Sequence, residues 1–462
     1  MAKTSDAEGA RPGEGWGARL LVIRNLDRRA RSKKCSAVNR DLYQHHVARC
    51  SLRQLLYQQT RHSLTPFLAD MLSNWLFFLA SAPTAYGATY YVSPSGSDSA
   101  AGTLAAPYRG IQMAVDKAVA GDTIYLREGT YSPTTNIQIK SKSGTVSAPI
   151  TLSSYNGEKV IIDGEGLPYT PAALDAALPM ASRGILHVEQ ANYWRIYGLE
   201  LINGPYGLYA LDSSNNMYER LVTRDNYETG LQIQGASAKN VVLYLDSHGN
   251  RDPRKNGESA DGLAIKEGTG AGNLIKGARL WNNVDDGLDF WEFKSGITIE
   301  DTIAWGNGVN RWGFSPFTGD GNGFKLGGGN DGEIGAADHD IRNCIAFSNA
   351  AKGFTDNSQT GRFTFSRNTA WNNGDSGFKL DTSVSTLREN VAAANAKSQT
   401  SFTGSQTQAG NSWNVGGTWD NAAFQSVSSS AVTGPRASDG KVVGSDFLLP
   451  KTGSQIGATT YW

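Results

Sequence analysis

The sequence predicts an all-β protein, a right-handed parallel β-helix with an N-terminal capping helix. A Gly residue followed by an apolar residue recurs at intervals of 23 to 36 residues, and repetition at such a period indicates a solenoid of stacked coils. The regular Leu-x-x-Leu-x-Leu frame and the paired Trp-Asp marks are missing from the sequence, which favours a β-helix over leucine-rich horseshoes and propellers. The repeat steps are Gly207-Leu208, Gly230-Leu231, Gly262-Leu263, Gly287-Leu288, Gly323-Phe324, Gly353-Phe354 and Gly377-Phe378.

The two ends of the predicted solenoid differ from its repeats. The segment from Thr89 combines a strand, a Gly- and Ser-rich turn, an amphipathic helix around Ile111 to Ala118 and a further strand. We expect the helix to cap the N-terminal end, where unpaired strand edges and an apolar cross-section would otherwise be exposed. Beyond about residue 395, Ser, Thr, Gln and Gly dominate. This tail is expected to pack back along the coils or to cap their far end.

The coils between these ends are predicted from runs in which apolar and polar residues alternate before an Asn or a Gly. Each run is expected to supply one strand of a coil. The clearest runs are NLIKGARLW, ITIEDTIAW, DIRNCIAF and FTFSRNTAW. An Asn lies shortly before the Gly step in several repeats, and stacked Asn side chains would form an internal ladder. These residues are Asn203, Asn226, Asn250, Asn283, Asn349 and Asn373.

The N-terminal region has a different composition. Residues 1–70 carry 13 Lys and Arg against 6 Asp and Glu, and we interpret them as an unstructured extension or as a start assigned too early, in preference to a nucleic-acid-binding arm. Residues 71–88 form a short apolar run that ends in small residues, which is typical of a secretory signal peptide cleaved after Gly87. The run is too short for a stable membrane anchor. We therefore expect a secreted protein whose β-helix domain spans residues 89–462.

Charge and cysteine content argue against nucleic-acid binding, a disulfide framework and a cysteine nucleophile. The formal net charge of the chain is zero, and nothing in the repeats suggests nucleic-acid binding. Cys35 and Cys50 precede the predicted cleavage point, so no disulfide framework is possible in the repeats. Cys344 alternates with apolar neighbours, which favours a buried structural cysteine over a nucleophile.

Four aspartates and a lysine occupy corresponding places in consecutive repeats. They are Asp261 in SADGLAIK, Asp285, Asp286 and Asp289 in VDDGLDFW, and Lys325 in GNGFKLGG. If the Gly steps stack, Asp261 lies beside Asp286, and Asp289 lies beside Lys325, because neighbouring strands are only about 4.8 Å apart. A lone Asp-Gly pair is an ordinary turn former. Four aligned carboxylates need a compensating cation, and they predict a metal site made of oxygen ligands.

Other charged residues near this cluster could bind the carboxylates of an acidic substrate, with hydrated surface side chains as the alternative interpretation. They are Lys266, which follows Asp261, and Arg251, Arg254 and Arg311 in two long Gly- and Asn-rich inserts that could wall a groove. Lys379 provides a control, because it stands in the same Gly-Phe-Lys-Leu context as Lys325 without an acidic repeat beside it.

The segments ADGLAIK, WNNVDDGLDFW and NGFKLGG, in this order and spacing, resemble polysaccharide lyase family 9, the calcium-dependent pectate lyases with a right-handed parallel β-helix. The YYVSPSGSD opening and the DFLLPKTGSQIGA close add to a likeness that covers most of residues 89–462. The resemblance implies that residues 89–462 form a catalytic domain, that Asp261, Asp285, Asp286 and Asp289 ligate Ca²⁺, and that Lys325 is the catalytic base. The implied partner is polygalacturonate or a related pectic polysaccharide. We expect the protein to be a monomer.

The residue chemistry agrees with this implication but leaves two alternatives open. Elimination across C4 and C5 of a uronate removes a weakly acidic proton beside a carboxylate. A bound cation can stabilise the resulting charge, and an unprotonated lysine can take the proton. One alternative is a polygalacturonase-type hydrolase in which paired carboxylates act as acid and base, although the Gly-His-Gly and Arg-Ile-Lys elements associated with such enzymes are missing from the sequence. The other is a noncatalytic polysaccharide-binding β-helix whose aspartates hold a structural ion.

Overall fold

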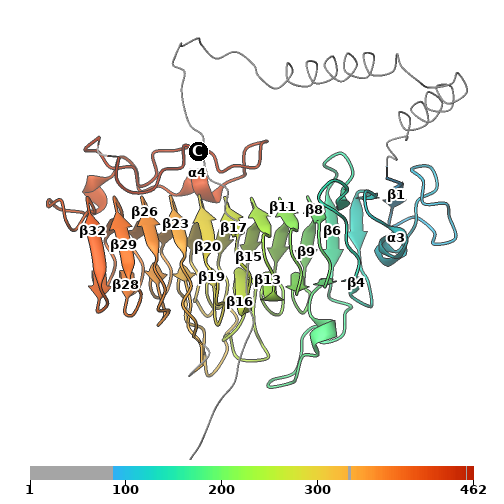
Figure 1. Cartoon of the computed structure of the whole chain (residues 1–462), viewed down its shortest axis with the longest axis horizontal. Helices are drawn as coiled ribbons and strands as arrows, with labels where there is room; N and C mark the ends of the chain where they lie inside the picture. Colours follow the sequence, from blue (N-terminus) through green and yellow to red (C-terminus); the bar gives the residue numbers. More distant parts are fainter. Residues whose placement is uncertain (1–86, 331–333, 454) are drawn as a thin grey trace, which may run out of the picture. The chain divides into compact units, whose positions relative to one another are not determined.

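Three parallel sheets run side by side along the Ala85–Trp462 unit of the chain, and from residue 123 onward each turn of the backbone adds one strand to each sheet. The structure is a computed structural model that describes residues 87–330, 334–453 and 455–462. The chain visits sheet 1, sheet 2 and sheet 3 in turn, and every hydrogen-bonded strand neighbour within these sheets comes from an adjacent coil (Figure 1). This arrangement is a parallel β-helix, and the predicted fold is confirmed.

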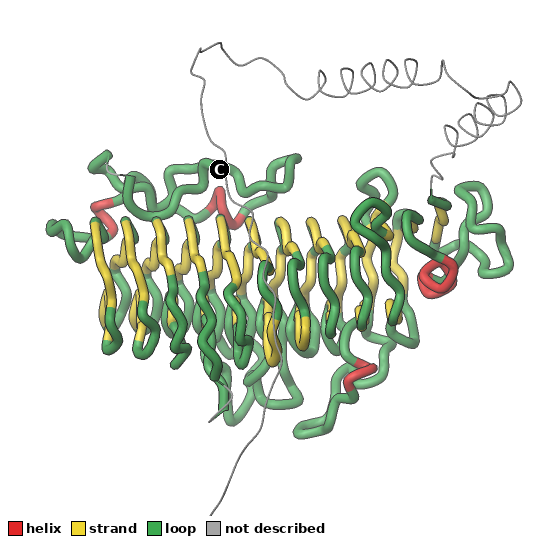
Figure 2. Tube along the Cα trace, viewed as in Figure 1, coloured by secondary structure: helices red, strands yellow, loops and turns green. Residues whose placement is uncertain are grey.

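The described strands are short and are joined by turns and loops, as the trace shows (Figure 2). Sheet 1 consists of β1 (Thr89–Val92), β2 (Thr123–Leu126), β5 (Ile150–Ser154), β8 (Trp194–Tyr197), β11 (Met217–Glu219), β14 (Val241–Leu243), β17 (Asn273–Lys276), β20 (Ile297–Glu300), β23 (Asp340–Arg342), β26 (Thr364–Ser366), β29 (Ser385–Arg388) and β32 (Gln406–Ala409). Sheet 2 consists of β3 (Gly129–Tyr131), β6 (Val160–Asp163), β9 (Glu200–Ile202), β12 (Val222–Arg224), β15 (Asp246–His248), β18 (Arg279–Trp281), β21 (Ile303–Trp305), β24 (Ile345–Phe347), β27 (Thr369–Trp371) and β30 (Val391–Ala393). Sheet 3 consists of β4 (Ile137–Lys140), β7 (Leu186–Glu189), β10 (Leu208–Leu211), β13 (Leu231–Ala236), β16 (Leu263–Thr269), β19 (Leu288–Asp289), β22 (Phe324–Lys325), β25 (Phe354–Thr355), β28 (Ser376–Leu380) and β31 (Ser398–Phe402).

The alternating runs do not each form one strand, and this part of the prediction is wrong. Each run divides into a strand of sheet 1 and a strand of sheet 2, as NLIKGARLW does between β17 and β18. The break lies at a residue with positive φ, a conformation that turns the chain sharply between two sheets. These residues are Gly277 (φ 65°), Asp301 (φ 53°), Asn343 (φ 52°) and Arg367 (φ 55°).

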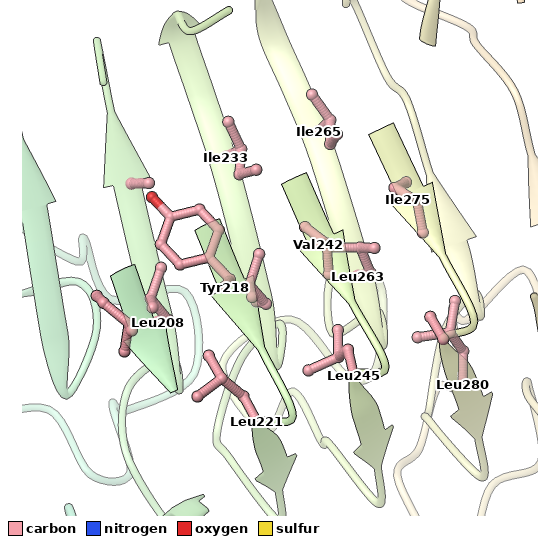
Figure 3. Packing of buried hydrophobic residues seen from close by; sticks show 14 of the residues in the cluster. Leu208, Tyr218, Leu221, Ile233, Val242, Leu245, Leu263, Ile265, Ile275 and Leu280 are labelled. Carbon is pink, nitrogen blue, oxygen red and sulfur yellow. The ribbon is translucent and has the colours of Figure 1, made fainter. Parts of the chain in front are cut away.

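The repeated Gly-apolar step sets the register of sheet 3. Leu263 pairs with Leu288, and Leu288 with Phe324, so the apolar residues of the steps stack inside the coil. The aliphatic side chains of neighbouring coils fill the interior in the same way (Figure 3). A side chain could not replace Gly287, since a Cβ atom there would lie 2.6 Å from the carbonyl oxygen of Gly323. The predicted stacking is therefore confirmed.

A ladder of buried Asn side chains lies at the turn before sheet 3. Its members pass hydrogen bonds from Nδ2 to the Oδ1 of the next coil, at 3.0 Å from Asn226 to Asn250 and 2.9 Å from Asn307 to Asn349. Asn203 lies outside the ladder, because it bonds Asp163 and Gly204 occupies the ladder position of its coil. The ladder comprises Asn226, Asn250, Asn283, Asn307, Asn349, Asn373 and Asn395.

The N-terminal end of the solenoid is capped by a helix, and the C-terminal tail lies along the side of the coils. Helix α3 (Ile111–Lys117) buries Ile111, Ala114 and Val115 against the first coils, as expected for a cap. The C-terminal tail packs back on the outer face of sheet 2, where Phe447 and other apolar side chains of the tail cover Phe347. The tail contains η2 (Asn421–Ala423) and α4 (Ser430–Thr433). Among the described residues, no helix is long and apolar enough to cross a membrane.

The N-terminal region and Cys344 were both subjects of prediction. The predicted extension, residues 1–70, and nearly all of the predicted signal peptide, residues 71–88, lie outside the described residues. Cys344 follows the turn between β23 and β24, is fully buried, and packs with the core, and burial raises the pKa of its thiol. The prediction of a structural cysteine is confirmed by this position.

Candidate metal and proton-transfer site

The predicted acidic cluster lies at the start of two neighbouring strands of sheet 3. Asp261 precedes β16, Asp285 and Asp286 precede β19, and Asp289 is the second residue of β19. All four carboxylates are buried, with exposed fractions of 1% or less. The register that places the Gly steps side by side also brings Asp289 opposite Lys325 of β22. The predicted convergence of these residues is therefore confirmed. Their roles as metal ligands and as a base stay predictions.

Three of the four aspartates gather around one point. Asp261, Asp285 and Asp286 each offer an oxygen, and these oxygens lie within 4.8 Å of one another. The Oδ2 atom of Asp286 is buried and accepts no hydrogen bond. Calcium binds hard oxygen ligands at 2.3–2.6 Å, so oxygens at this separation can share one ion. The donor set and the free oxygen therefore fit a calcium ion.

Asp289 stands between two lysines. Its Oδ2 atom lies 2.7 Å from Nζ of Lys266 and 3.5 Å from Nζ of Lys325. Lys266 also contacts Asp261 at 2.8 Å, and Lys325 lies 3.3 Å from Oδ2 of Asp286. Two ammonium groups thus offset part of the negative charge of the four aspartates.

The charge balance controls the protonation of every group in the cluster. Burial, reinforced by neighbouring carboxylates, raises the pKa of Asp261 to about 6 and that of Asp286 to about 7. Burial also raises the pKa of Asp285, but at Asp289 the two ammonium groups outweigh it and lower the pKa. Burial alone would lower the pKa of Lys325, yet the surrounding aspartates hold it well above its ordinary value. Without a metal, Lys325 is therefore an ammonium ion.

Lys325 also contacts a fifth carboxylate, which the sequence analysis did not predict. Asp320 lies in the loop before β22, and its Oδ2 atom is 2.8 Å from Nζ of Lys325. The same loop supplies Asn322, whose backbone N–H and side-chain amide both donate to Oδ1 of Asp286. The Gly-Asp-Gly-Asn-Gly sequence around Asp320 is typical of a turn and does not by itself mark these residues as part of a site. The loop instead orders two groups around the cluster.

The other predicted residues divide into one within the cluster and three outside it. Lys266 is part of the cluster, with its side chain 13% exposed. Arg254 is committed to Glu228, whose Oε1 lies 2.5 Å from Nη2. Arg251 lies over the ring of Tyr227, at 4.2 Å from its centroid. Arg311 is exposed and bonds Asn282 at the turn after β18. The cluster does not include these three arginines.

Three long loops precede strands of sheet 3 and contact one another beside the cluster. Residues 164–185 precede β7, residues 249–262 precede β16, and residues 306–323 precede β22. The backbone N–H of Asp175 donates to the carbonyl of Arg254 at 2.8 Å, and the hydroxyl of Thr318 donates to the carbonyl of Lys255 at 2.8 Å. These contacts join the three loops beside the start of sheet 3, and the predicted groove stays a prediction.

Comparison with known proteins places this arrangement in a family. Residues 90–418 match the family described as Pel9A-like, right handed beta helix region. The chain is 62% identical to the pectate lyase PEL9 of Emericella nidulans over 406 residues, which cover 84% of this chain and 98% of that protein. It is 32% identical to pectate lyase L of Dickeya chrysanthemi over 373 residues, which cover 79% of this chain and 84% of that protein.

A solved structure agrees with these sequence matches. The crystal structure of the pectate lyase Pel9A superposes with a TM-score of 0.66 at 30% identity, covering 80% of this chain and 91% of that one. The parallel β-helix described above is therefore right-handed, as predicted. With its fold and most of its length shared with these relatives, the chain belongs to the Pel9A-like family of right-handed β-helix pectate lyases.

Proposed function

We propose that the chain is a secreted pectate lyase that cleaves polygalacturonate by β-elimination, with calcium held by Asp261, Asp285, Asp286 and Asp289 and with Lys325 as the base. One observation carries the proposal. A single buried cluster contains three carboxylates that suit one ion, and a lysine lies on the neighbouring strand. A hard cation held by carboxylates suits an acidic sugar, and the neighbouring amine supplies the group that accepts a proton.

The reaction that this proposal requires balances without another reactant. Nζ of Lys325 takes the proton from C5 of the sugar, the electrons of the C5–H bond form the C4=C5 double bond, and the C4–O bond breaks with its electron pair on O4. O4 gains a proton as it leaves, so the net change moves one proton from C5 to O4 and consumes nothing else. Calcium, when bound, offsets the charge of the aspartates and stabilises the charge that develops beside the C6 carboxylate. The ring of Trp291, whose centroid lies 5.4 Å from Nζ, packs beside the amine and limits where it can reach.

The protonation of Lys325 connects this chemistry to pH. An ammonium ion cannot accept the C5 proton, and four nearby carboxylates, including Asp289 and Asp320, favour the ammonium form. Turnover therefore requires that this negative charge be offset, and the rate should rise with pH while Lys325 loses its proton.

The product identifies the reaction. Purified residues 89–462 should convert polygalacturonate to unsaturated uronates, detected by their ultraviolet absorbance, in the presence of calcium and not with a chelator. New reducing ends without this absorbance would make the protein a hydrolase. Binding without any product would make it a polysaccharide-binding protein and leave the aspartates as ligands of a structural ion.

Export is tested separately, by the N-terminus of the protein recovered from the medium. The short apolar run of residues 71–88 with its small residues supports cleavage after Gly87. Mass spectrometry should find an N-terminus at Ala88 or Thr89. A secreted chain that still begins at Met1 would contradict the proposed signal peptide.

A further inference from the structure

Arg183 lies over the outer face of sheet 3, several coils before the acidic cluster. It is the last charged residue of the long loop that precedes β7, and its side chain is half-buried. The guanidinium carbon is 5.5 Å from the ring centroid of Tyr209 and 6.0 Å from that of Tyr206. Nη1 reaches the hydroxyl of Tyr209 at 3.4 Å and Oε1 of Gln234 at 3.5 Å. Aromatic packing thus fixes the plane of the guanidinium group.

The positive charge of Arg183 has no ion-pair partner in the described part of the chain, where no carboxylate oxygen lies within 4.0 Å of it. Glu228 acts on Arg183 only from a longer distance, and its carboxylate is bonded to Arg254. The buried Nε atom of Arg183 also makes no hydrogen bond. Nε is shielded from solvent and Nη1 contacts Tyr209 and Gln234, which leaves Nη2 of this half-buried cation to meet a carboxylate from outside the chain.

Arg183 and the proposed base lie along the same row of the sheet. Tyr209 pairs with Gln232, which pairs with Ala264, and Ala264 pairs with Asp289 beside Lys325. Side chains of one row point to the same face of a sheet. With strands about 4.8 Å apart, the four steps from β10 to β22 amount to about 19 Å.

A chain of buried polar contacts leads from Tyr209 toward the cluster and reaches the surface at Glu267. The hydroxyl of Tyr209 donates to Gln234 at 2.6 Å, and the amide of Gln234 donates to Glu267 at 2.5 Å. Glu267 directly follows Lys266 of the cluster. A linear polyuronate carries one carboxylate on each sugar, so a chain held at Lys325 and lying along this row presents a carboxylate to Arg183 several sugars away.

We infer that Arg183, oriented by Tyr206 and Tyr209, forms a distal subsite that binds the carboxylate of a uronate several sugars from the bond that is broken. This inference rests on the proposed function. Arg183 is a specificity-determining residue in this view: it selects long acidic chains and does not take part in the elimination. A hydrogen bond from an Arg guanidinium to a carboxylate is charge-assisted, which makes it stronger than one between neutral groups.

Kinetics on oligogalacturonates of defined length test the subsite. Arg183→Gln should raise KM for octamers about tenfold, the value expected for one charge-assisted hydrogen bond, with little change in kcat. KM for trimers, which are too short to reach Arg183 from Lys325, should stay at its wild-type value. Arg183→Lys should fall between the two, because it keeps the charge and loses the planar fork. Arg195→Gln is the matched control, since Arg195 is exposed on sheet 1 in the same coil.

Each other outcome overturns a defined part of the argument. If wild-type protein forms unsaturated product and Arg183→Gln keeps the wild-type KM for octamers, the subsite is wrong and the proposed function stands. Equal losses on trimers and octamers, together with a lower unfolding temperature, would assign Arg183 to holding its loop and would also overturn the subsite. A wild-type protein that forms no unsaturated product would overturn the proposed function, and the subsite with it.

Discussion

Lys325 and Lys379 occupy the same row of sheet 3 in the same Gly-Phe-Lys-Leu sequence, yet their surroundings are opposite. Lys325 pairs across the strands with Asp289, its side chain is 8% exposed, and three carboxylates lie within 3.5 Å. Lys379 pairs with Thr355, its side chain is 36% exposed, and it forms an ion pair with Asp381 at 3.4 Å. A repeat can therefore copy a residue together with its backbone position, while the neighbouring coils decide whether the copy can do chemistry.

The largest expected difference between the two lysines is in turnover. Lys325→Ala should lower kcat by about 10² to 10⁴-fold, the usual contribution of a positioned general base. Lys379→Ala should retain close to wild-type kcat. Both are measured with calcium, as the rate of unsaturated product formation from polygalacturonate. Equal losses in the two variants would contradict the assignment of the base.

Without calcium, substitution of Lys325 should lower the free energy of unfolding more than substitution of Lys379. Removing Lys325 as Lys325→Met leaves buried carboxylates without their partner, which costs about 3–5 kcal/mol when a buried pair is broken. Lys379→Met breaks one partly exposed pair and should cost no more than about 1 kcal/mol. Denaturant unfolding in the presence of a chelator measures both costs at neutral pH.

The stability of the metal-free protein should also change in a defined direction at alkaline pH. The pKa of Lys325 is raised in the folded protein above its ordinary value of about 10.5. Its stabilising contribution is therefore fully present below about pH 10.5 and is lost as pH rises through the higher folded pKa. Metal-free wild type should lose this contribution at high pH, whereas Lys325→Met has none to lose. Parallel stability curves for the two proteins above about pH 10.5 would refute the charge balance described for the cluster.

The carboxylates that distinguish Lys325 should also determine calcium affinity. Asp286→Asn keeps the shape of the side chain and removes its charge, and it should weaken calcium binding by at least about tenfold. Asp381→Asn, which alters the partner of Lys379, should leave calcium affinity unchanged. Calorimetric titration with calcium alone measures this without reference to turnover. Wild-type affinity in Asp286→Asn would remove this residue from the proposed ligands.

The residues that lie side by side on neighbouring strands of sheet 3 could be predicted from the sequence, because the repeated Gly-apolar step sets their register. The Gly-apolar copies located Asp289 beside Lys325 without any knowledge of the loops. The same logic failed for Asn203, one residue away from the ladder position, and it overlooked Asn307, whose repeat has a long insert between ladder and Gly step. Periodicity also could not divide the alternating runs, because one positive-φ residue such as Asp301 separates two strands without interrupting the alternation.

The remainder of the site depends on loops that the repeats do not encode. Asp320 reaches Lys325 from a long insert, and Arg183 reaches Tyr209 from another. Arg254, a plausible substrate ligand from its sequence alone, is instead paired with Glu228 in the preceding coil. Loop residues meet partners far away in sequence at distances that no period defines, so their pairing follows only from the folded chain.

The smallest expected effect comes from giving Lys379 the neighbour that Lys325 has. Thr355→Asp places a carboxylate opposite Lys379 in the register that Asp289 holds opposite Lys325. In the Lys325→Ala background, this change should leave unsaturated product at the background rate, because Thr355→Asp adds one carboxylate and the metal site calls for several converging oxygens. Lys379 would also remain partly exposed, where water screens the added charge. Turnover above background in Lys325→Ala/Thr355→Asp would mean that one neighbouring carboxylate is sufficient to make a base of this lysine, and that the burial of the cluster contributes less than we propose.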